Sequence, residues 1–418
     1  MLIGCVLLGA FAAGACSGSD GAAGPTGKPG ATGPIGAPGP QGPAGGGSDA
    51  GNYLTGACTV PCHAFTGVLA QWRFSNHSHP QENEVGGGTC GNCHALDGIQ
   101  QRVAGNVTVP VGATPQNVTK GHVSYLTATN TAGEVNYGGA STIGQIHCST
   151  CHAFDSKTDP HVTGKYSPGQ APIRVPGGAG DTAFIEKSPQ GSATPVGQSV
   201  AYRAGNLCIF CHKSRKDAAL YVTASNSLSM RWGPHNGPQA DIFTGKGGYP
   251  LSQVGETYGT SVHSTLSNGC VDCHMPPAPE NGNVPDHTMK PRIDLCKTCH
   301  VTYTGKDFNI DSGRSVVTAG LTELEGLLSD AGLITRTTGP LTPEELADKQ
   351  FHLDVPRSGT VDAEVAGAVY NYLLVARGKD LGVHNPRYTK QLLWDSIRLI
   401  RNKYGGGVPV FLATRPPS

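Results

Sequence analysis

One short motif occurs six times in this chain and constrains the fold more than any other feature. Two cysteines are followed at once by histidine, with two residues between the cysteines in five copies and three in the first. This is the attachment signature of c-type haem, in which both thiols bond the porphyrin and the adjacent histidine is an axial ligand of the iron. The sequence therefore predicts six covalent haems. The copies, called motifs 1 to 6, are Cys58-Thr59-Val60-Pro61-Cys62-His63, Cys90-Gly91-Asn92-Cys93-His94, Cys148-Ser149-Thr150-Cys151-His152, Cys208-Ile209-Phe210-Cys211-His212, Cys270-Val271-Asp272-Cys273-His274 and Cys296-Lys297-Thr298-Cys299-His300.

Structural zinc sites also contain Cys-x-x-Cys pairs with a nearby histidine. A zinc site does not need the histidine directly after the second cysteine, yet all six copies have it there. A zinc array would also need a fourth ligand for each metal, and a disulfide framework would not need the histidines. Of the 14 cysteines only Cys5 and Cys16 lie outside the motifs, so we expect no structural disulfide.

The first 16 residues have the pattern of an export signal. Residues 2–15 are apolar but too few to form a permanent membrane span, which is typical of the hydrophobic part of a signal peptide. No lysine or arginine precedes them, so we expect the true start codon to lie upstream. Ala13-Gly14-Ala15-Cys16 has the form of a bacterial lipoprotein cleavage site, and Cys16 is the predicted lipidation site. The alternative is an ordinary cleavage site with an incidental cysteine. Because haem is attached after export, we expect an outer-membrane, cell-surface or extracellular location.

Residues 17–50 form a collagen-like segment. Glycine stands at every third position from Gly21 to Gly45, and only glycine fits at the crowded axis of a collagen triple helix. So few triplets make a weak triple helix, and we expect a stiff, extended spacer between a lipid anchor and the rest of the chain. A homotrimer is the alternative.

Composition limits the choice of partner and of fold. The formal net charge is +0 and 14% of the residues are charged, which gives no reason to expect binding to nucleic acid or to an anionic membrane surface. Aromatic residues make up 6% of the chain, whereas it contains 60 glycines and 31 prolines. Such a chain builds a large side-chain core with difficulty, so we expect the haems to supply apolar surface. The predicted fold over residues 51–305 is a multihaem cytochrome domain of mostly irregular loops, with short α-helices at the motifs.

Residues 306–418 have a different pattern, which predicts a haem-free, mainly helical region packed on the haem domain. Three groups of apolar residues recur at helical spacing. Asn385 is a suitable N-cap for the third helix, Pro386 suits its first turn, and Gly405 is suited to end it. The groups are Leu321, Leu324, Leu327 and Leu328; Val365, Val369, Leu373 and Ala376; and Tyr388, Leu392, Ile397 and Ile400.

Histidine is the predicted second axial ligand of the irons. The chain has 16 histidines, so ten remain after the six motif histidines, whereas two of the four methionines, Met1 and Met275, are poorly placed to serve. Two histidines per iron fill both axial positions and favour electron transfer over binding of small molecules. The preferred distal ligands are His77, His161, His235, His263 and His287. His384 and His122 compete for the sixth place, while His79, His147 and His352 are expected on the surface or beside a ligand.

Residues 255–405 resemble the last two haems and helical tail of pentahaem nitrite reductases and related cytochromes. The resemblance rests on His263, motif 5 with the following Met275-Pro276, Asp286-His287, motif 6 and Gly382-Val383-His384-Asn385-Pro386. It implies that His287 and His384 are distal ligands. The substrate haem of those reductases usually has a lysine ligand, and no motif here ends in lysine. The lipoprotein signal, the spacer and the dispersed motifs resemble the outer-surface multihaem cytochromes of metal-reducing bacteria.

These observations favour an electron-transfer protein without catalytic residues of its own. We expect a hexahaem cytochrome that relays electrons from an outer-membrane conduit or other multihaem cytochromes to extracellular acceptors such as metal oxides and humics. Two alternatives stay open. One haem could lack a distal ligand and reduce nitrite, hydroxylamine or a sulfur oxyanion, or the subunits could polymerise into a conducting filament.

Overall fold

The computed structural model describes residues 67–78, 88–116, 124–129, 132–139, 144–153, 171–175, 177–187, 196–278, 284–335 and 355–418. Gly51–Ser418 forms one compact unit, separate from Met1–Ala50. The predicted haem region 51–305 and helical region 306–418 therefore belong to the same unit. The predictions that lie outside the described residues concern the signal peptide 1–16 with Cys16, the collagen-like segment 17–50, motif 1 (Cys58, Cys62 and His63), and His79, His122, His161 and His352.

The described part of the chain is a mixture of helices and small sheets. Five of its sheets have two strands and one has three, and every strand pair is antiparallel. The sequence predicted loops here, but short pairing satisfies backbone polar groups where no long element forms. The sheets are β1 (Val107–Thr108) with β5 (Asn136–Tyr137); β2 (Thr114–Gln116), β3 (Ser124–Leu126) and β4 (Ala132–Glu134); β6 (Ala183–Lys187) with β7 (Val196–Val200); β8 (Ser225–Leu228) with β13 (Gly359–Asp362); β9 (Pro277–Ala278) with β10 (Val284–Pro285); and β11 (Ile334–Thr335) with β12 (Val355–Pro356).

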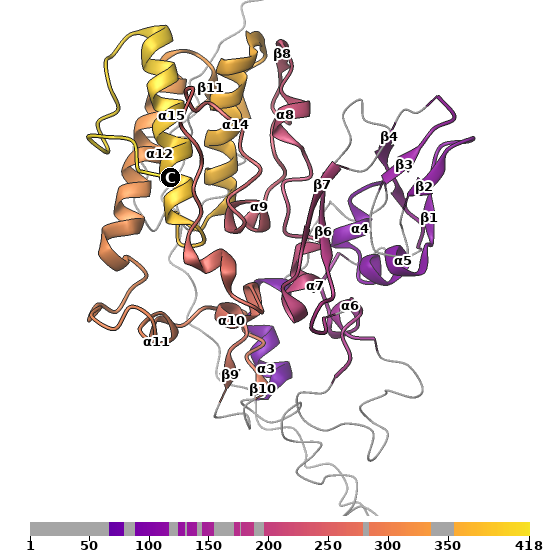
Figure 1. Ribbon diagram of the computed structural model, residues 1–418. Coiled ribbons are helices and arrows are strands. Elements are labelled where there is room, and N and C mark those ends of the chain that lie inside the picture. Colours follow the sequence, from indigo (N-terminus) through magenta and orange to yellow (C-terminus); the bar gives the residue numbers. More distant parts are fainter. Residues whose placement is uncertain are drawn as a thin grey trace, which may run out of the picture. The chain divides into compact units, whose positions relative to one another are not determined.

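Short helices alternate with these strands, and many of them coincide with the cysteine motifs (Figure 1). Each is one or two turns long, so each owes its stability to the contacts around it and not to its own length. The short α-helices are α3 (Val68–Arg73), α4 (Gly91–His94), α5 (Gly98–Ala104), α6 (Cys148–Cys151), α7 (Asn206–Ile209), α8 (Ala218–Tyr221), α9 (Gln239–Phe243), α10 (Cys270–His274) and α11 (Ile293–Cys296). The 3-10 helices are η2 (Asn76–Ser78), η4 (Arg203–Gly205), η5 (Val262–Thr265) and η7 (Ile310–Ser312).

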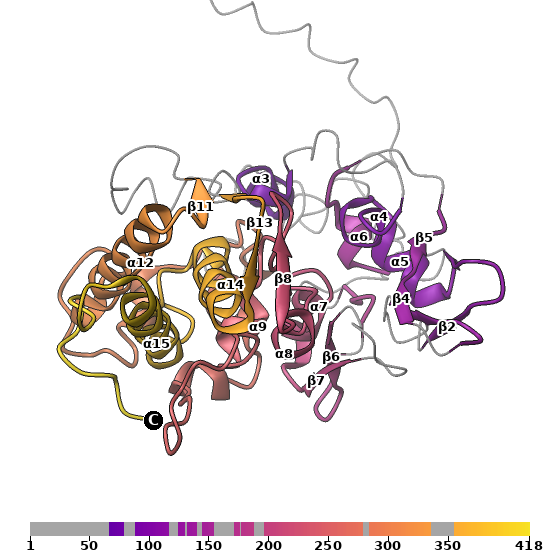
Figure 2. The same ribbon diagram turned by 90° about the horizontal axis from the view of Figure 1, so that it is seen from above.

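Three long helices, α12 (Gly313–Asp330), α14 (Ala363–Gly378) and α15 (Pro386–Tyr404), lie side by side in both views of the chain (Figures 1 and 2). Helix α14 is buried along its whole length from Val365 to Gly378, as expected for a helix that is apolar on all sides. The three predicted apolar groups all point into one hydrophobic core, with Leu327 at its edge. The prediction of three helices is confirmed.

The beginning and end of α15 agree with the sequence. The side chain of Asn385 accepts a hydrogen bond from the backbone N–H of Tyr388 at 3.3 Å, and Pro386 occupies the first turn. Gly405 follows the last residue with φ +88°, a conformation that glycine adopts without strain. The predicted cap and stop are confirmed.

Polar contacts fix the helices to the segment that follows motif 4. Asn371 is fully buried in α14, accepts the backbone N–H of Tyr249 at 2.7 Å and donates to its carbonyl at 3.0 Å. Strand β13, which leads into α14, pairs with β8. Trp232 and Ile242 from the same segment belong to the helical core. The core is therefore shared between the two predicted regions.

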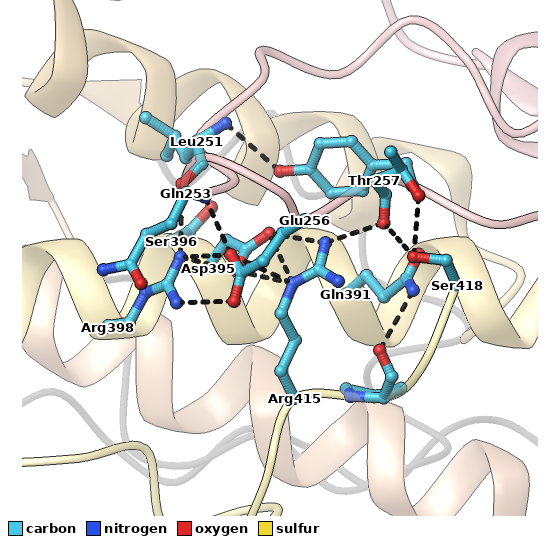
Figure 3. A network of polar contacts seen from close by, with 12 residues as sticks. Leu251, Gln253, Glu256, Thr257, Gln391, Asp395, Ser396, Arg398, Arg415 and Ser418 are labelled. Atoms are coloured by element: carbon cyan, nitrogen blue, oxygen red, sulfur yellow. Dashed lines mark hydrogen bonds and ion pairs between the residues drawn. The ribbon is translucent and has the colours of Figure 1, made fainter.

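The C-terminal residues are held against α15 by a network of charged and polar groups (Figure 3). Arg415 donates to the buried Asp395 at 2.9–3.1 Å, and Arg398 donates to Asp395 at 3.0 Å. Gln391 donates to the carbonyls of Pro416 and Pro417 at 3.0 and 2.8 Å. These contacts place the last residues of the chain on the outer surface of the helical core.

Among the residues that the structure describes, no helix has the length and apolarity needed to cross a membrane.

Candidate functional site

Each described motif forms a single helical turn. The backbone N–H of the motif histidine donates to the carbonyl of the first cysteine at 3.0 Å in motif 2, 2.8 Å in motif 3, 3.0 Å in motif 4 and 2.8 Å in motif 6, and α10 spans motif 5. Residues three and four positions apart lie on the same face of a helix. Both thiols and the imidazole of one motif are therefore directed to one side of the turn, as attachment to a single porphyrin requires.

All ten described motif cysteines are free thiols. Burial raises the pKa of Cys148, and it raises the pKa of Cys151 and Cys273 to about 11. The pKa of Cys93 is lowered, first by its hydrogen bond to Cys211, so the motif thiols do not share one environment.

Each of the five described motif histidines faces one histidine from another part of the chain. The partners are the distal candidates His235, His287, His77, His384 and His263, and no two motifs share a partner. The ring centroids are 6.1 Å apart in His94–His235, 6.2 Å in His152–His287, 6.0 Å in His212–His77, 6.1 Å in His274–His384 and 6.2 Å in His300–His263.

These separations suit two imidazoles on one metal ion. With metal–nitrogen bonds of about 2 Å, and each ring centre about 1.1 Å behind its bonded nitrogen, two ligands on opposite sides of a metal have centroids about 6 Å apart. Tilted aromatic pairs in general fall between about 4.5 and 7 Å, so one such distance alone would mean little. Here five separate pairs, each containing one motif histidine, have centroid distances within 0.2 Å of one another.

In seven of these ten histidines the Nδ1 atom faces a hydrogen-bond acceptor within the chain. Carbonyl oxygens only accept, so Nδ1 carries the proton and Nε2 keeps a free lone pair. Metal-binding histidines are held in this way almost without exception. The acceptors are the carbonyls of Pro172 for His152 (3.3 Å), Asn236 for His235 (2.7 Å), Val383 for His263 (2.8 Å), Met289 for His274 (2.9 Å) and Pro285 for His287 (2.7 Å), the side-chain oxygen of Gln239 for His212 (3.0 Å), and the sulfur of Met289 for His77.

Burial favours the neutral form of these imidazoles, which is the form that binds metal. It lowers the pKa of His152, His212, His235 and His287. Burial, together with the nearby His212, lowers the pKa of His77 to about 4. These histidines are therefore uncharged near neutral pH.

Two residues near the pairs were not predicted from the sequence. Met289 has φ +54° and contacts two sites, because its carbonyl accepts from His274 and its sulfur lies against His77. Gln239 accepts from His212 and donates to the carbonyl of Gly378 in α14 at 3.0 Å. Nothing in their sequence context marks either residue, since both act through contacts between distant segments.

The connection between α14 and α15 serves two pairs. It carries His384, and the carbonyl of Val383 accepts from His263. Asn385, which is fully buried, accepts the backbone N–H of Ser261 at 3.0 Å and donates to Thr260 at 2.8 Å. The segment around His263 is thereby fixed to the start of α15.

Neighbouring motifs are in contact through their thiols. The sulfur of Cys93 lies 3.8 Å from the carbonyl of Phe210 in motif 4, and the sulfur of Cys211 lies 3.9 Å from the carbonyl of Cys93. The pKa of Cys208 is raised first by its hydrogen bond to Cys270 of motif 5 and then by burial, with Cys151 of motif 3 adding a smaller effect. Motif 4 is therefore adjacent to motifs 2, 3 and 5.

Motif 6 adjoins motif 5. Burial raises the pKa of Cys273, and the next largest contribution comes from Cys296 of motif 6. Motif 5 therefore lies near motifs 4 and 6, and motif 4 also lies near motifs 2 and 3.

Buried charges surround motif 4. Lys187 pairs with Asp241 and donates to Ser214 at 2.6 Å, and Lys213 lies 3.7 Å from Glu186. These four charged side chains are at most 6% exposed. Burial of a charge is costly unless it is paired, so this network holds the backbone after His212 in one conformation.

Within the described residues, no three His, Cys, Asp or Glu side chains come together as they do at a metal site built from protein ligands alone. Haem iron takes four nitrogens from its porphyrin and needs at most two protein ligands. A pair of histidines is therefore a sufficient protein contribution, and the donor set suits haem better than zinc.

The structure brings together each of the described distal candidates with a motif histidine. His147, which the sequence excludes from ligation, lies instead with its ring centroid 5.3 Å from that of Trp72. The partner of His63, the preferred ligand His161 and His122, the competitor of His384, fall outside the described residues.

No protein-family model matches this chain, and neither the curated proteins nor the solved structures contain a significant match.

Proposed function

We propose that this protein is a multihaem c-type cytochrome that transfers electrons through low-spin haems, each held between two histidines. The observation that carries the proposal is the set of five histidine pairs, each joining one motif to one histidine from a distant segment. Bound haem would supply one-electron chemistry. The residues of the chain would hold both axial positions of each iron and so exclude small-molecule substrates.

The contacts between motifs support a relay. Electron transfer between cofactors requires that they lie close together, and the thiols of motifs 2, 4 and 5 lie side by side. Among the described motifs, motif 4 lies near motifs 2, 3 and 5, so a haem at motif 4 would connect the haems at those three motifs. Haems attached to these thiols would therefore have neighbouring attachment points.

The proposed partners are other multihaem cytochromes, or an outer-membrane conduit as donor, and extracellular metal oxides or humics as acceptors. The proposed location is the outer membrane, the cell surface or the extracellular medium. Anchoring at a membrane depends on lipidation of Cys16, for which extraction of the full-length chain with membranes is the direct check.

The first experiment measures haem content and spin state of the purified full-length chain. We expect six haems per chain by mass, low-spin absorption and electron paramagnetic resonance spectra, and little binding of carbon monoxide. High-spin iron together with nitrite or hydroxylamine turnover would show that the protein is a reductase and not an electron relay. Zinc in place of haem would refute the proposal. Fibres seen by electron microscopy would show that the protein transfers electrons as the subunit of a filament.

The second experiment tests the relay through motif 4. Replacing Cys208 and Cys211 by serine should remove the haem at motif 4, which lies near motifs 2, 3 and 5, and replacing Cys296 and Cys299 should remove the haem at motif 6, which lies near motif 5. We expect the first variant to slow electron transfer from dithionite to ferric citrate much more than the second. Equal rates in the two variants would mean that the haems react independently with solution.

A further inference from the structure

One histidine of the five pairs differs from the others in what lies behind its ring. The Nδ1 atom of His384 faces the carboxylate of Asp380 at 3.5 Å, whereas the acceptors found for the other histidines are carbonyl oxygens, an amide oxygen and a sulfur. A carboxylate in this position carries a full negative charge, and the others do not. The His274–His384 pair is thereby set apart by charge.

Asp380 is buried, with 3% of its side chain exposed. Its Oδ2 accepts the backbone N–H of His384 at 2.9 Å, while its Oδ1 has no hydrogen-bond partner among the described residues. Its ion-pair contact with His384 is the 3.5 Å approach of Nδ1. Its charge therefore acts mainly on His384 and on whatever His384 binds.

The connection that carries both residues is rigid. Lys379 and Leu381 have φ +57° and +48°, and Gly382 has φ +83°. A side chain at Gly382 would lie 2.6 Å from Val317, and Leu381 is 1% exposed. The packing of α12 against this turn holds Asp380 and His384 at a fixed separation.

We propose that Asp380 is a positioning residue for His384 that lowers the reduction potential of the haem at motif 5 below that of the same site with a neutral partner. The inference rests on the proposed function, since it requires haem at His274 and His384. Asp380 holds the backbone of His384 through the hydrogen bond from its N–H, and it places a carboxylate 3.5 Å behind the ring, beyond hydrogen-bond contact with Nδ1.

The direction of the effect follows from charge. A ferric haem carries one more positive charge than a ferrous haem, so a buried carboxylate behind an axial ligand stabilises the oxidised state. Hydrogen bonds and charges beyond the ligand are among the means by which proteins set haem potentials. A neutral acceptor in the same place stabilises the oxidised state less.

The test is a spectroelectrochemical titration of the haem-loaded, full-length protein and its Asp380→Asn and Asp380→Glu variants. Asparagine retains an acceptor for the backbone N–H of His384 but removes the charge. We expect the ferrous-to-ferric ratio of one haem to increase about tenfold at a fixed potential, which is about 59 mV for one electron. Low-spin spectra and thermal stability should be unchanged, and Asp380→Glu should restore the lower potential.

Gln239→Glu provides the matched opposite change, because it places a carboxylate behind His212, where the wild-type acceptor is neutral. The potential of the haem at motif 4 should fall. If Asp380→Asn lowers stability without moving any potential, Asp380 is only a turn residue and the inference is wrong. If the preparations contain no haem, the proposed function fails instead, so the two failures are distinguishable.

Discussion

The helical region and the motif region of this chain are built on different principles. Helices α12, α14 and α15 bury long apolar side chains against one another, and residues such as Leu373 and Leu324 have no exposed surface. In the motif region the described hydrophobic clusters are small, one around Ile185 and one of only Ala95 and Tyr137. The helices supply most of one large core, to which residues 218–258 also contribute, whereas the rest of the motif region has small clusters and pairs of histidines.

The contrast shows how a chain with few aromatic residues can hold more than four hundred residues together. Burial of side-chain surface is the main driving force of folding, and where the chain does not supply that surface another group must. In this chain the helical region would serve as a folded base, and cofactors would complete the rest. The predictions below test this difference, beginning with the largest expected effect.

Removing the cofactor should separate the two regions most clearly. In chain produced without haem attachment, we expect the amides of α4, α6, α10 and α11 to exchange with solvent as in an unfolded chain, because these single turns have little core of their own. The amides of α14 and α15 should remain protected. Hydrogen exchange read by mass spectrometry measures both at once, with haem-loaded protein as the control. Equal loss of protection in α14 would mean that the helices also depend on haem.

The converse change disturbs the side-chain core alone. Leu373→Ala in the centre of α14 should lower the free energy of unfolding by about 2–5 kcal/mol, through lost burial and the cavity that remains. Denaturant titration followed by circular dichroism measures the change. The low-spin spectrum should persist under native conditions, and its loss at the same denaturant concentration as the helices would show that the regions unfold together.

His384 lies where the two regions meet, so His384→Ala removes a proposed ligand without altering the core. One haem of the six should become high-spin and change its potential, with all six still attached. His147→Ala is the comparison, since His147 contacts Trp72 and caps α6 of motif 3 but is in none of the five histidine pairs, so every haem should stay low-spin. An unaltered low-spin spectrum for His384→Ala would exclude His384 as a ligand.

The smallest expected effect concerns the outer surface of the helical region. Hydrogen bonds from Arg398 at 3.1 and 3.0 Å lower the pKa of Glu256 (Figure 3). A carboxyl group whose pKa is lowered in the folded state stabilises the fold at pH values above its ordinary, unfolded-state pKa. That contribution is lost as the pH falls through the lowered, folded-state pKa. We expect up to about 1 kcal/mol, because Glu256 is partly exposed.

The measurement compares the unfolding free energy of wild type and Glu256→Gln from pH 7 down through 4.5, the ordinary value for this group. The difference should shrink below pH 4.5. Burial raises the pKa of the neighbouring Asp395, whose titration acts in the opposite sense and is present in both proteins. If the difference in unfolding free energy does not change with pH, the Glu256–Arg398 ion pair does not contribute to stability.

The helical region was largely predictable from the sequence. Its apolar residues recur at helical spacing, and the cap at Asn385 and the stop at Gly405 are local signals that the structure confirms. The single turns at the motifs are equally local, because the spacing of their ligands demands one face of a helix. Local signals were sufficient wherever one element determined the conformation.

Pairing of histidines was less predictable. The sequence selected His77, His235, His263 and His287, and left His384 in competition, but it did not say which motif each would face. Those partners are set by loops without periodicity and by short strand pairs that the sequence did not indicate. Asp380, Gln239 and Met289 were missed for the same reason, although the four-residue spacing between Asp380 and His384 is a signal that a search for residues behind each ligand could have used.

The order of the paired histidines along the chain has a consequence for biogenesis. His77 and His263 precede their partners His212 and His300, so under the proposed export those two sites would have both histidines as soon as the motif emerges. Motifs 2, 3 and 5 precede His235, His287 and His384 in the chain, so a haem attached there would wait, open on one face, for a later segment. The site at His274 would be the last to close, when the start of α15 arrives. Maturation would therefore end with docking of the helical region, and a pause in export before that point would leave reactive iron exposed to its surroundings.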